Sequence, residues 1–245
     1  MKLLVLSTLF LVSESVKLPS NFKTCNRKQA DFDTCLLEAA NYDVKLFKKP
    51  IKEFKTPSLD PLVIPKIIAT VGSPLATVTA TLKNCIFSGL IDTQIENFVF
   101  DFEKKIVELK ANFPELKSHC AYEIDGKIFF VDVKGKGDNS SAIFKNFKWT
   151  FKMTYAEIPR RGKTYVKPIL TYFDGKPESL TINIDGLFDG DKELGERANK
   201  VINDNWSAIY DSVKYRYLEN AKEVWLELFN EWFKKLSLEE AFDNN

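Results

Sequence analysis

The spacing of apolar residues changes once along the chain, and this change constrains the fold more than any other feature. From about Leu75 to Ile184 apolar residues occur at every second position. This period is typical of strands whose side chains alternate between two faces of a sheet. From Asp189 to Leu236 they recur at three- and four-residue steps, which is the period of an amphipathic helix. The sequence therefore predicts a meandering antiparallel sheet followed by a long C-terminal helix.

The predicted strands each have one apolar and one polar face. Phe98, Phe100 and Phe102 share a face, as do the apolar residues of 107–113. The same alternation covers 147–155, 166–172 and 180–184. Turn signals separate the runs, and we expect turns at these sites: Asp125-Gly126, Gly135 to Asn139, Arg161-Gly162 and Asp174 to Pro177. Three prolines between Lys55 and Pro65 predict an extended segment that leads into the sheet.

The helical stripe is longer than the helices of most globular proteins. No Pro or Gly interrupts it after Gly195, so we expect one helix reaching Leu236. Such a helix needs an apolar partner along its length, and the sheet offers the one large apolar face. The predicted fold class is therefore α+β, with a long helix wrapped by a curved antiparallel sheet. The 20 phenylalanines suit either a fully packed interior or one that keeps an apolar cavity.

The N-terminus has the pattern of a secretory signal peptide. Lys2 precedes an apolar run that ends at Val12, and Ser13-Glu14-Ser15 supplies small residues for cleavage after Ser15. The alternative, a membrane anchor, needs about 20 apolar residues, and this run is shorter. We expect residues 1–15 to be removed, and residues 16–245 to form one secreted, extracellular domain without stable membrane insertion.

Export would place the four cysteines in an oxidising compartment, where disulfides form. Cys25 and Cys35 are close in sequence, whereas Cys85 and Cys120 lie on separate strand-like segments. The simplest of the three possible pairings is Cys25 with Cys35 and Cys85 with Cys120, with free thiols at the second pair as the alternative. No spacing typical of a zinc site occurs, so we expect no metal site.

Two sequons for N-glycosylation occur. Asn139-Ser140-Ser141 lies in a predicted Gly-rich turn, where it could be modified. Asn205-Trp206-Ser207 lies inside the helical pattern, and a chance match explains it better. We therefore expect glycosylation at Asn139.

Several function classes find little support. The net charge is +1, without the basic excess that nucleic acid binding requires. The chain has one histidine, His119, and no Gly-x-Ser-x-Gly elbow, which argues against a lipase or esterase. We expect His119 to point outward, and we assign no catalytic residues and no cofactor. A pair of catalytic carboxylates stays open, since no acidic pair stands out.

Four blocks of sequence, taken together, resemble a known family. They are TCNRKQADFDTCL around Cys25 and Cys35, LDPLVIPKI from Leu59, YEIDGKIFFVDVKGKGD from Tyr122, and LFDGDKELGERANKVINDNW from Leu187. In this order they resemble the takeout and haemolymph juvenile-hormone-binding protein family of insects. The resemblance covers the whole mature chain.

The resemblance implies a long helix inside a highly curved sheet, enclosing an apolar tunnel for a small hydrophobic ligand. Strand and helix faces then select the side chains expected to line this tunnel. They are Phe98, Phe100, Val107, Leu109, Tyr122, Phe147, Trp149, Phe151, Val166, Tyr172, Val201 and Ile209. Tyr122, Trp149 and Tyr172 could also donate a hydrogen bond that orients the ligand.

The second cysteine pair departs from the resemblance. In hormone carriers of the family a second pair lies further along the chain than Cys85 and Cys120, so the ligand stays open among juvenile-hormone-like terpenoids, carotenoids and fatty acids. The predicted function is passive carriage of such a ligand, with no protein partner identified. The alternative is an extracellular protein-interaction or membrane-lipid-binding module that holds no stoichiometric small ligand.

Overall fold

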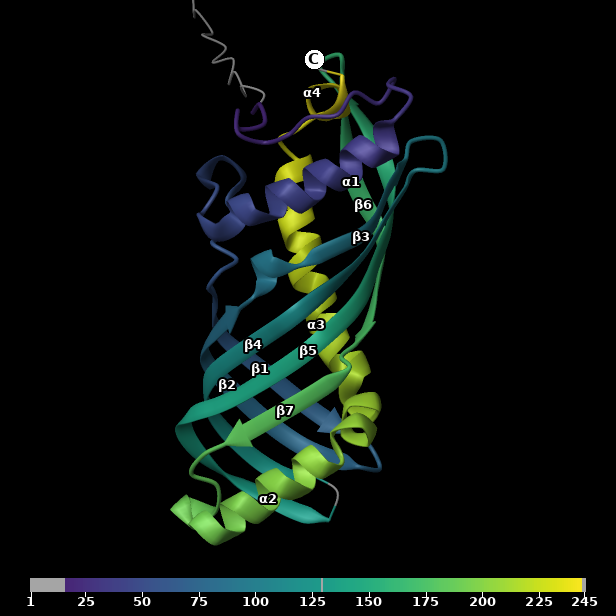
Figure 1. The fold of residues 1–245 in the computed structure, drawn as a ribbon. Coiled ribbons are helices and arrows are strands. Elements are labelled where there is room, and N and C mark those ends of the chain that lie inside the picture. Colours follow the sequence, from purple (N-terminus) through teal and green to yellow (C-terminus); the bar gives the residue numbers. More distant parts are fainter. Residues whose placement is uncertain (1–15, 129, 244–245) are drawn as a thin grey trace, which may run out of the picture.

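The computed structural model describes residues 16–128 and 130–243, and it confirms the α+β fold class (Figure 1). The predicted signal peptide, residues 1–15, lies outside the described residues. The helices are α1 (Phe32–Asp43), α2 (Lys192–Asp204), α3 (Trp206–Phe233) and α4 (Leu238–Phe242). The strands are β1 (Leu62–Gly72), β2 (Ala76–Ser88), β3 (Gln94–Asp101), β4 (Ile106–Ile128), β5 (Val131–Arg160), β6 (Lys163–Lys176) and β7 (Ser179–Ile184). Short 3₁₀ turns occupy Val44–Lys48, Lys52–Phe54, Leu90–Asp92 and Phe188–Gly190.

One antiparallel sheet of seven strands forms within the described ranges, in the order β1-β2-β4-β5-β6. The remaining two strands pair with the two longest ones. β3 pairs with β4 on the same side as β2 but along a different part of β4, and β7 pairs with β5 on the same side as β6 but along a different part of β5. Strands of 23 and 30 residues accumulate a large twist. The sheet therefore curls around α3, while α1 and α4 lie at one end and α2 at the other (Figure 1).

The period-two prediction is confirmed on the two central strands. In β4 the residues 107, 109, 111 and 113 are buried, and in β5 every second residue from Phe147 to Tyr155 is buried. Together with α3 residues such as Tyr210 and Leu218 they form the main hydrophobic cluster. His119 lies on the outer face of β4 and is exposed, as expected.

The sheet begins earlier than the sequence predicted. Residues 62–72 form β1 rather than a lead-in segment, and β1 pairs with β2 along its length. Pro65 is tolerated there because β1 is an edge strand, where a missing N–H can face away from the ladder.

Two predicted turns are wrong, because Asp125-Gly126 and Gly135 to Asn139 lie inside β4 and β5. The chain does not reverse at these glycines. Instead, the absence of a side chain lets neighbouring groups approach the backbone closely. A Cβ at Gly126 would lie 2.1 Å from the carbonyl oxygen of Thr77, and one at Gly137 would lie 3.0 Å from the ring of Tyr122. The predicted turn at Arg161-Gly162 is confirmed.

The predicted single C-terminal helix is also wrong, because it breaks at Asn205. This residue has φ −117° and ψ 16°, outside the helical region. Its side-chain amide donates to the carbonyl of Val201 at 2.8 Å, which satisfies a group left unpaired at the end of α2. The break lets α2 turn across the end of the sheet (Figure 1).

The helix α2 is held to β7 by two asparagines one helical turn apart. Asn203 accepts from the N–H of Ile182 at 2.8 Å and donates to its carbonyl at 2.7 Å. Asn199 forms the same pair of bonds with Ile184, each at 3.0 Å. These amides take the place of a neighbouring strand, so the free edge of β7 is covered.

Both predicted disulfides are present. Cys25–Cys35 ties the N-terminal segment to α1, and Cys85–Cys120 joins β2 to β4. Paired cysteines fit an oxidising compartment.

Candidate functional site

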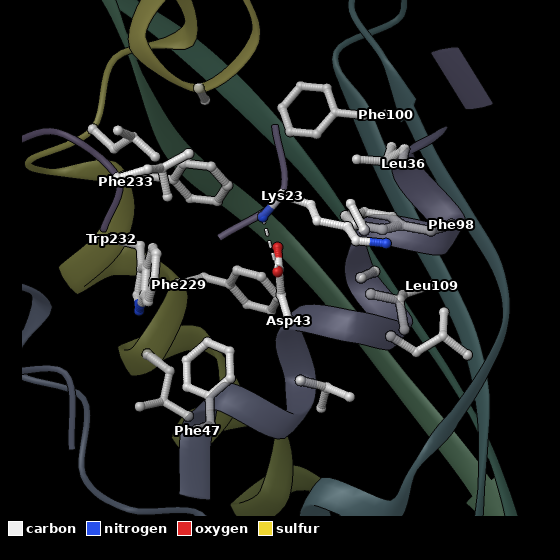
Figure 2. A pocket seen from close by; sticks show the side chains of 18 of the residues that line it. Lys23, Leu36, Asp43, Phe47, Phe98, Phe100, Leu109, Phe229, Trp232 and Phe233 are labelled. Carbon is white, nitrogen blue, oxygen red and sulfur yellow. Dashed lines mark hydrogen bonds between the residues drawn. The ribbon is translucent and has the colours of Figure 1, made fainter. Parts of the chain in front are cut away.

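The interior holds an apolar cavity of about 300 Å³ at the end of the molecule covered by α1 and α4. Strands β3, β4 and β5 form one wall, and the C-terminal half of α3 forms another. Figure 2 shows the aromatic rings that line it, among them Phe47, Phe98, Phe229 and Phe233. A cavity of this size and lining suits a small apolar molecule.

A second apolar cavity, of about 390 Å³, lies between the edge strand β1 and the middle of α3. The two cavities share Leu59, Trp225 and Leu228 as lining residues, so they adjoin one another. Trp225 also stacks on Trp149 of β5, with ring centroids 5.7 Å apart. The two indoles therefore lie between the first and second cavities, where β5 packs against α3.

The structure brings half of the predicted lining residues to these cavities. Those at the first cavity are Phe98, Phe100, Leu109, Trp149 and Phe151, and Phe147 lines the second. The other predicted residues line neither of the two. Val107 and Val166 are buried in the main cluster, Tyr122 and Ile209 belong to a second cluster near α2, and Val201 is partly buried.

Tyr172 does not face the interior. The residue is 54% exposed, so the prediction that it shares a face with Val166 is wrong. The cause is a bulge: Thr154 pairs with Leu170 and Tyr155 with Pro168, which leaves Ile169 without a partner residue in β5. One extra residue reverses the alternation that follows it.

Sequence reasoning missed the helix that closes the first cavity. Leu36, Ala39, Ala40 and Asp43 of α1 all line it. These residues recur at three- and four-residue steps, which is the pattern of one helix face. This spacing is the feature of the sequence that could have identified α1 as a lining helix. The lining rings of α3, Phe229 and Phe233, follow the same rule.

The polar groups of the first cavity are few. Trp149 is 6% exposed, and its indole N–H has no hydrogen-bond partner among the described residues. An unpaired buried donor is costly unless a ligand or water accepts its hydrogen bond. Tyr122, the other buried candidate donor, already donates to the carbonyl of Asp185.

Asp43 and Lys23 are the charged residues among those that line the first cavity. Burial raises the pKa of the Asp43 carboxyl to about 6, although the backbone N–H and the positive charge of Lys23 act to lower it. The Lys23 ammonium lies over the ring of Tyr42, 4.7 Å from its centroid.

One corner of the cavity is closed by Trp232 of α3. Its indole stacks on Phe54 with centroids 4.0 Å apart, and its N–H donates to the hydroxyl of Thr56 at 2.8 Å. The segment before β1 is thereby fixed against the helix.

Within the described parts of the chain, no cluster of three or more potential metal ligands is found. No helix in the same residues is long and apolar enough to cross a membrane.

Comparisons with known proteins agree with the fold. The structure of Takeout 1 from Epiphyas postvittana superimposes with a TM-score of 0.80 at 18% identity, over 91% of this chain and 100% of that one. The circadian clock-controlled protein daywake is 24% identical in Drosophila yakuba, over 94% of this chain and 90% of the relative. The Drosophila melanogaster protein of the same name is also 24% identical, over 95% and 91%.

The haemolymph juvenile hormone binding protein family matches residues 3–243, almost the full length. Family and fold together indicate a protein that binds hydrophobic ligands. The chain belongs to the haemolymph juvenile hormone binding protein family.

Proposed function

We propose that this protein is a secreted carrier that binds one small hydrophobic molecule in the first cavity, with an extended ligand reaching the second. The observation that carries the proposal is the apolar cavity of about 300 Å³, which is lined by α1, α3 and the concave face of the sheet. Burial of a ligand there removes its apolar surface from water, which contributes about 0.8 kcal/mol per CH₂ group.

The proposed ligand classes are juvenile-hormone-like terpenoids, carotenoids and fatty acids or their derivatives. The family and the aromatic lining support these classes. The function needs no bond to be made or broken, so we propose no catalytic residues.

A cavity-filling variant tests the proposal. Ala39 is buried on α1 and lines the cavity, whereas Glu38 of the same helix is exposed. We expect Ala39→Phe to weaken binding of a terpenoid, carotenoid and fatty-acid panel at least tenfold, by fluorescence titration. Glu38→Phe, which adds the same ring on the solvent side, should bind like the wild type. Equal affinity in the two variants would place the ligand elsewhere.

Secretion is part of the proposal, with residues 1–15 as the signal peptide and residues 16–245 as one domain. N-terminal sequencing of the protein secreted by insect cells should begin at Val16.

Asn139 is proposed as a glycosylation site because it is exposed on β5, where its amide hydrogen-bonds the Asp185 carboxylate. Treatment with an N-glycosidase should lower the mass of the wild type and leave that of Asn139→Gln unchanged.

A further inference from the structure

The carboxylate of Asp43 is an unusual feature of a cavity that is otherwise almost entirely apolar. Asp43 is the last residue of α1, and it follows Leu36, Ala39 and Ala40 on the face of the helix that lines the cavity. Figure 2 shows its carboxylate among the cavity side chains, near the rings of Phe47 and Phe229. The residue thus presents a charge on the ligand side of α1.

The surroundings compensate this charge only in part. Oδ1 of Asp43 accepts a hydrogen bond from the backbone N–H of Lys23 at 3.0 Å. The Lys23 side chain is exposed, and its ammonium lies over the ring of Tyr42. The raised pKa of Asp43, which burial causes, agrees with a carboxylate that lacks full solvation.

A ligand hydroxyl would supply what this carboxylate lacks. An O–H group donates a short, charge-assisted hydrogen bond to a carboxylate. A ligand carboxylate would instead bring a second negative charge into the same apolar space, and like charges there disfavour ionisation of both groups.

We infer that Asp43 makes the cavity selective for hydrophobic ligands that carry a hydroxyl group, and that it disfavours ionised fatty acids. This inference rests on the proposed carrier function and narrows its ligand class. The apolar chain of the ligand occupies the space between α3 and the sheet, and its hydroxyl lies at the C-terminal end of α1.

The test compares three probes of equal chain length at pH 7.5: hexadecanol, hexadecanoate and methyl hexadecanoate. For the wild type we expect hexadecanol to bind roughly tenfold more tightly than either of the other two probes. A factor of this size is what one hydrogen bond to a charged group contributes to affinity. Asp43→Leu should remove the advantage of the alcohol over the ester. Asp43→Asn, which keeps an acceptor for the Lys23 N–H, should bind hexadecanoate more tightly than the wild type does. Glu38→Gln, on the exposed side of α1, is the matched control and should leave all three affinities unchanged.

The outcomes separate the selectivity from the carrier function. If all three probes bind with equal affinity, the selectivity is overturned and the carrier function stands. If none of the three binds, the inference is overturned, and uptake of terpenoids and carotenoids by the same protein decides whether the carrier function stands. Tighter binding of hexadecanoate that is lost in Lys23→Met would assign the head group to Lys23 and overturn the inference. Thermal unfolding of each variant checks that it is folded.

Discussion

The side chain of Asn41 pairs with the backbone of Ile95 through two hydrogen bonds, donating to its carbonyl and accepting from its N–H, both at 2.9 Å. Asn41 lies on α1 and Ile95 on β3. The amide thereby attaches the helix that covers the first cavity to the edge of the sheet. Asn199 and Asn203 attach α2 to β7 in the same way at the other end of the molecule.

We predict that Asn41→Asp loosens this cover. One carboxylate oxygen would face the carbonyl of Ile95, where the amide now donates, and the loss should cost about 1–3 kcal/mol. Ligand release, measured by stopped-flow fluorescence, should become faster. Asn203→Asp is the matched control, since it should lower stability by a similar amount without changing the release rate. Equal release rates in both variants would show that α1 is not the cover.

The unpaired indole N–H of Trp149 leads to a second prediction. The indole nitrogen is fully buried in the structure, so a ligand reaches it only when neighbouring side chains move. A ligand with an acceptor oxygen can then accept its hydrogen bond, whereas a hydrocarbon cannot. Trp149→Phe should therefore weaken binding of methyl hexadecanoate about fivefold, or about 1 kcal/mol, relative to octadecane. Calorimetric titration of both ligands against both proteins measures this difference. An unchanged ratio of affinities would show that the N–H does not contact the ligand.

Stability should depend on pH through Asp43. Its pKa is raised from 3.8 to about 6 on folding, so the folded state binds more protons between these values. The free energy of unfolding therefore falls as the pH rises from about 4 to about 6. Above about pH 6 it stays lower by the full cost of ionising the Asp43 carboxyl in the folded state. Because the carboxyl is only half buried, we expect Asp43→Asn to be more stable by on the order of 1 kcal/mol at pH 7.5 and equal to the wild type at pH 4.

Urea unfolding at the two pH values measures this prediction. Glu38→Gln, on the exposed side of the same helix, controls for the loss of one negative charge. A gain for Asp43→Asn that is the same at both pH values would contradict the assignment to a raised pKa.

The Cys85–Cys120 disulfide should contribute strongly to stability. It spans 35 residues, against 10 for Cys25–Cys35, and loop-closure entropy gives about 4 and about 3 kcal/mol. For a chain of this size, replacing both Cys85 and Cys120 by alanine should lower Tm by roughly 10 °C. Differential scanning calorimetry measures the shift, and the wild type in reductant should melt lower still. A Tm unmoved by reductant would contradict the role of both bridges.

The fold was predictable where one period held over many residues. Alternation placed Phe147, Trp149 and Phe151 on the buried face of β5, and all three line a cavity. It failed beyond Ile169, because a bulge depends on the partner strand and leaves no mark in the period of its own strand. Tyr172 is exposed for that reason.

The cavity itself was less predictable than the sheet. Its cover, α1, has a short apolar stripe that does not reveal which surface it meets, and Asp43 on that stripe looks like an ordinary surface residue in the sequence. The break at Asn205 was hidden because the apolar spacing continues through it, while the backbone angles change at one residue. These features depend on tertiary contacts, which the pattern of a single segment does not contain.

Identification of the bound molecule tests the carrier function most directly. The protein would be purified from its native source and extracted with organic solvent, and the extract analysed by mass spectrometry. We predict one apolar molecule per protein chain, and from the position of Asp43 we predict that this molecule carries a hydroxyl group. An empty extract, together with no uptake of terpenoids, carotenoids, fatty alcohols or fatty acids by the purified protein, would contradict the carrier function.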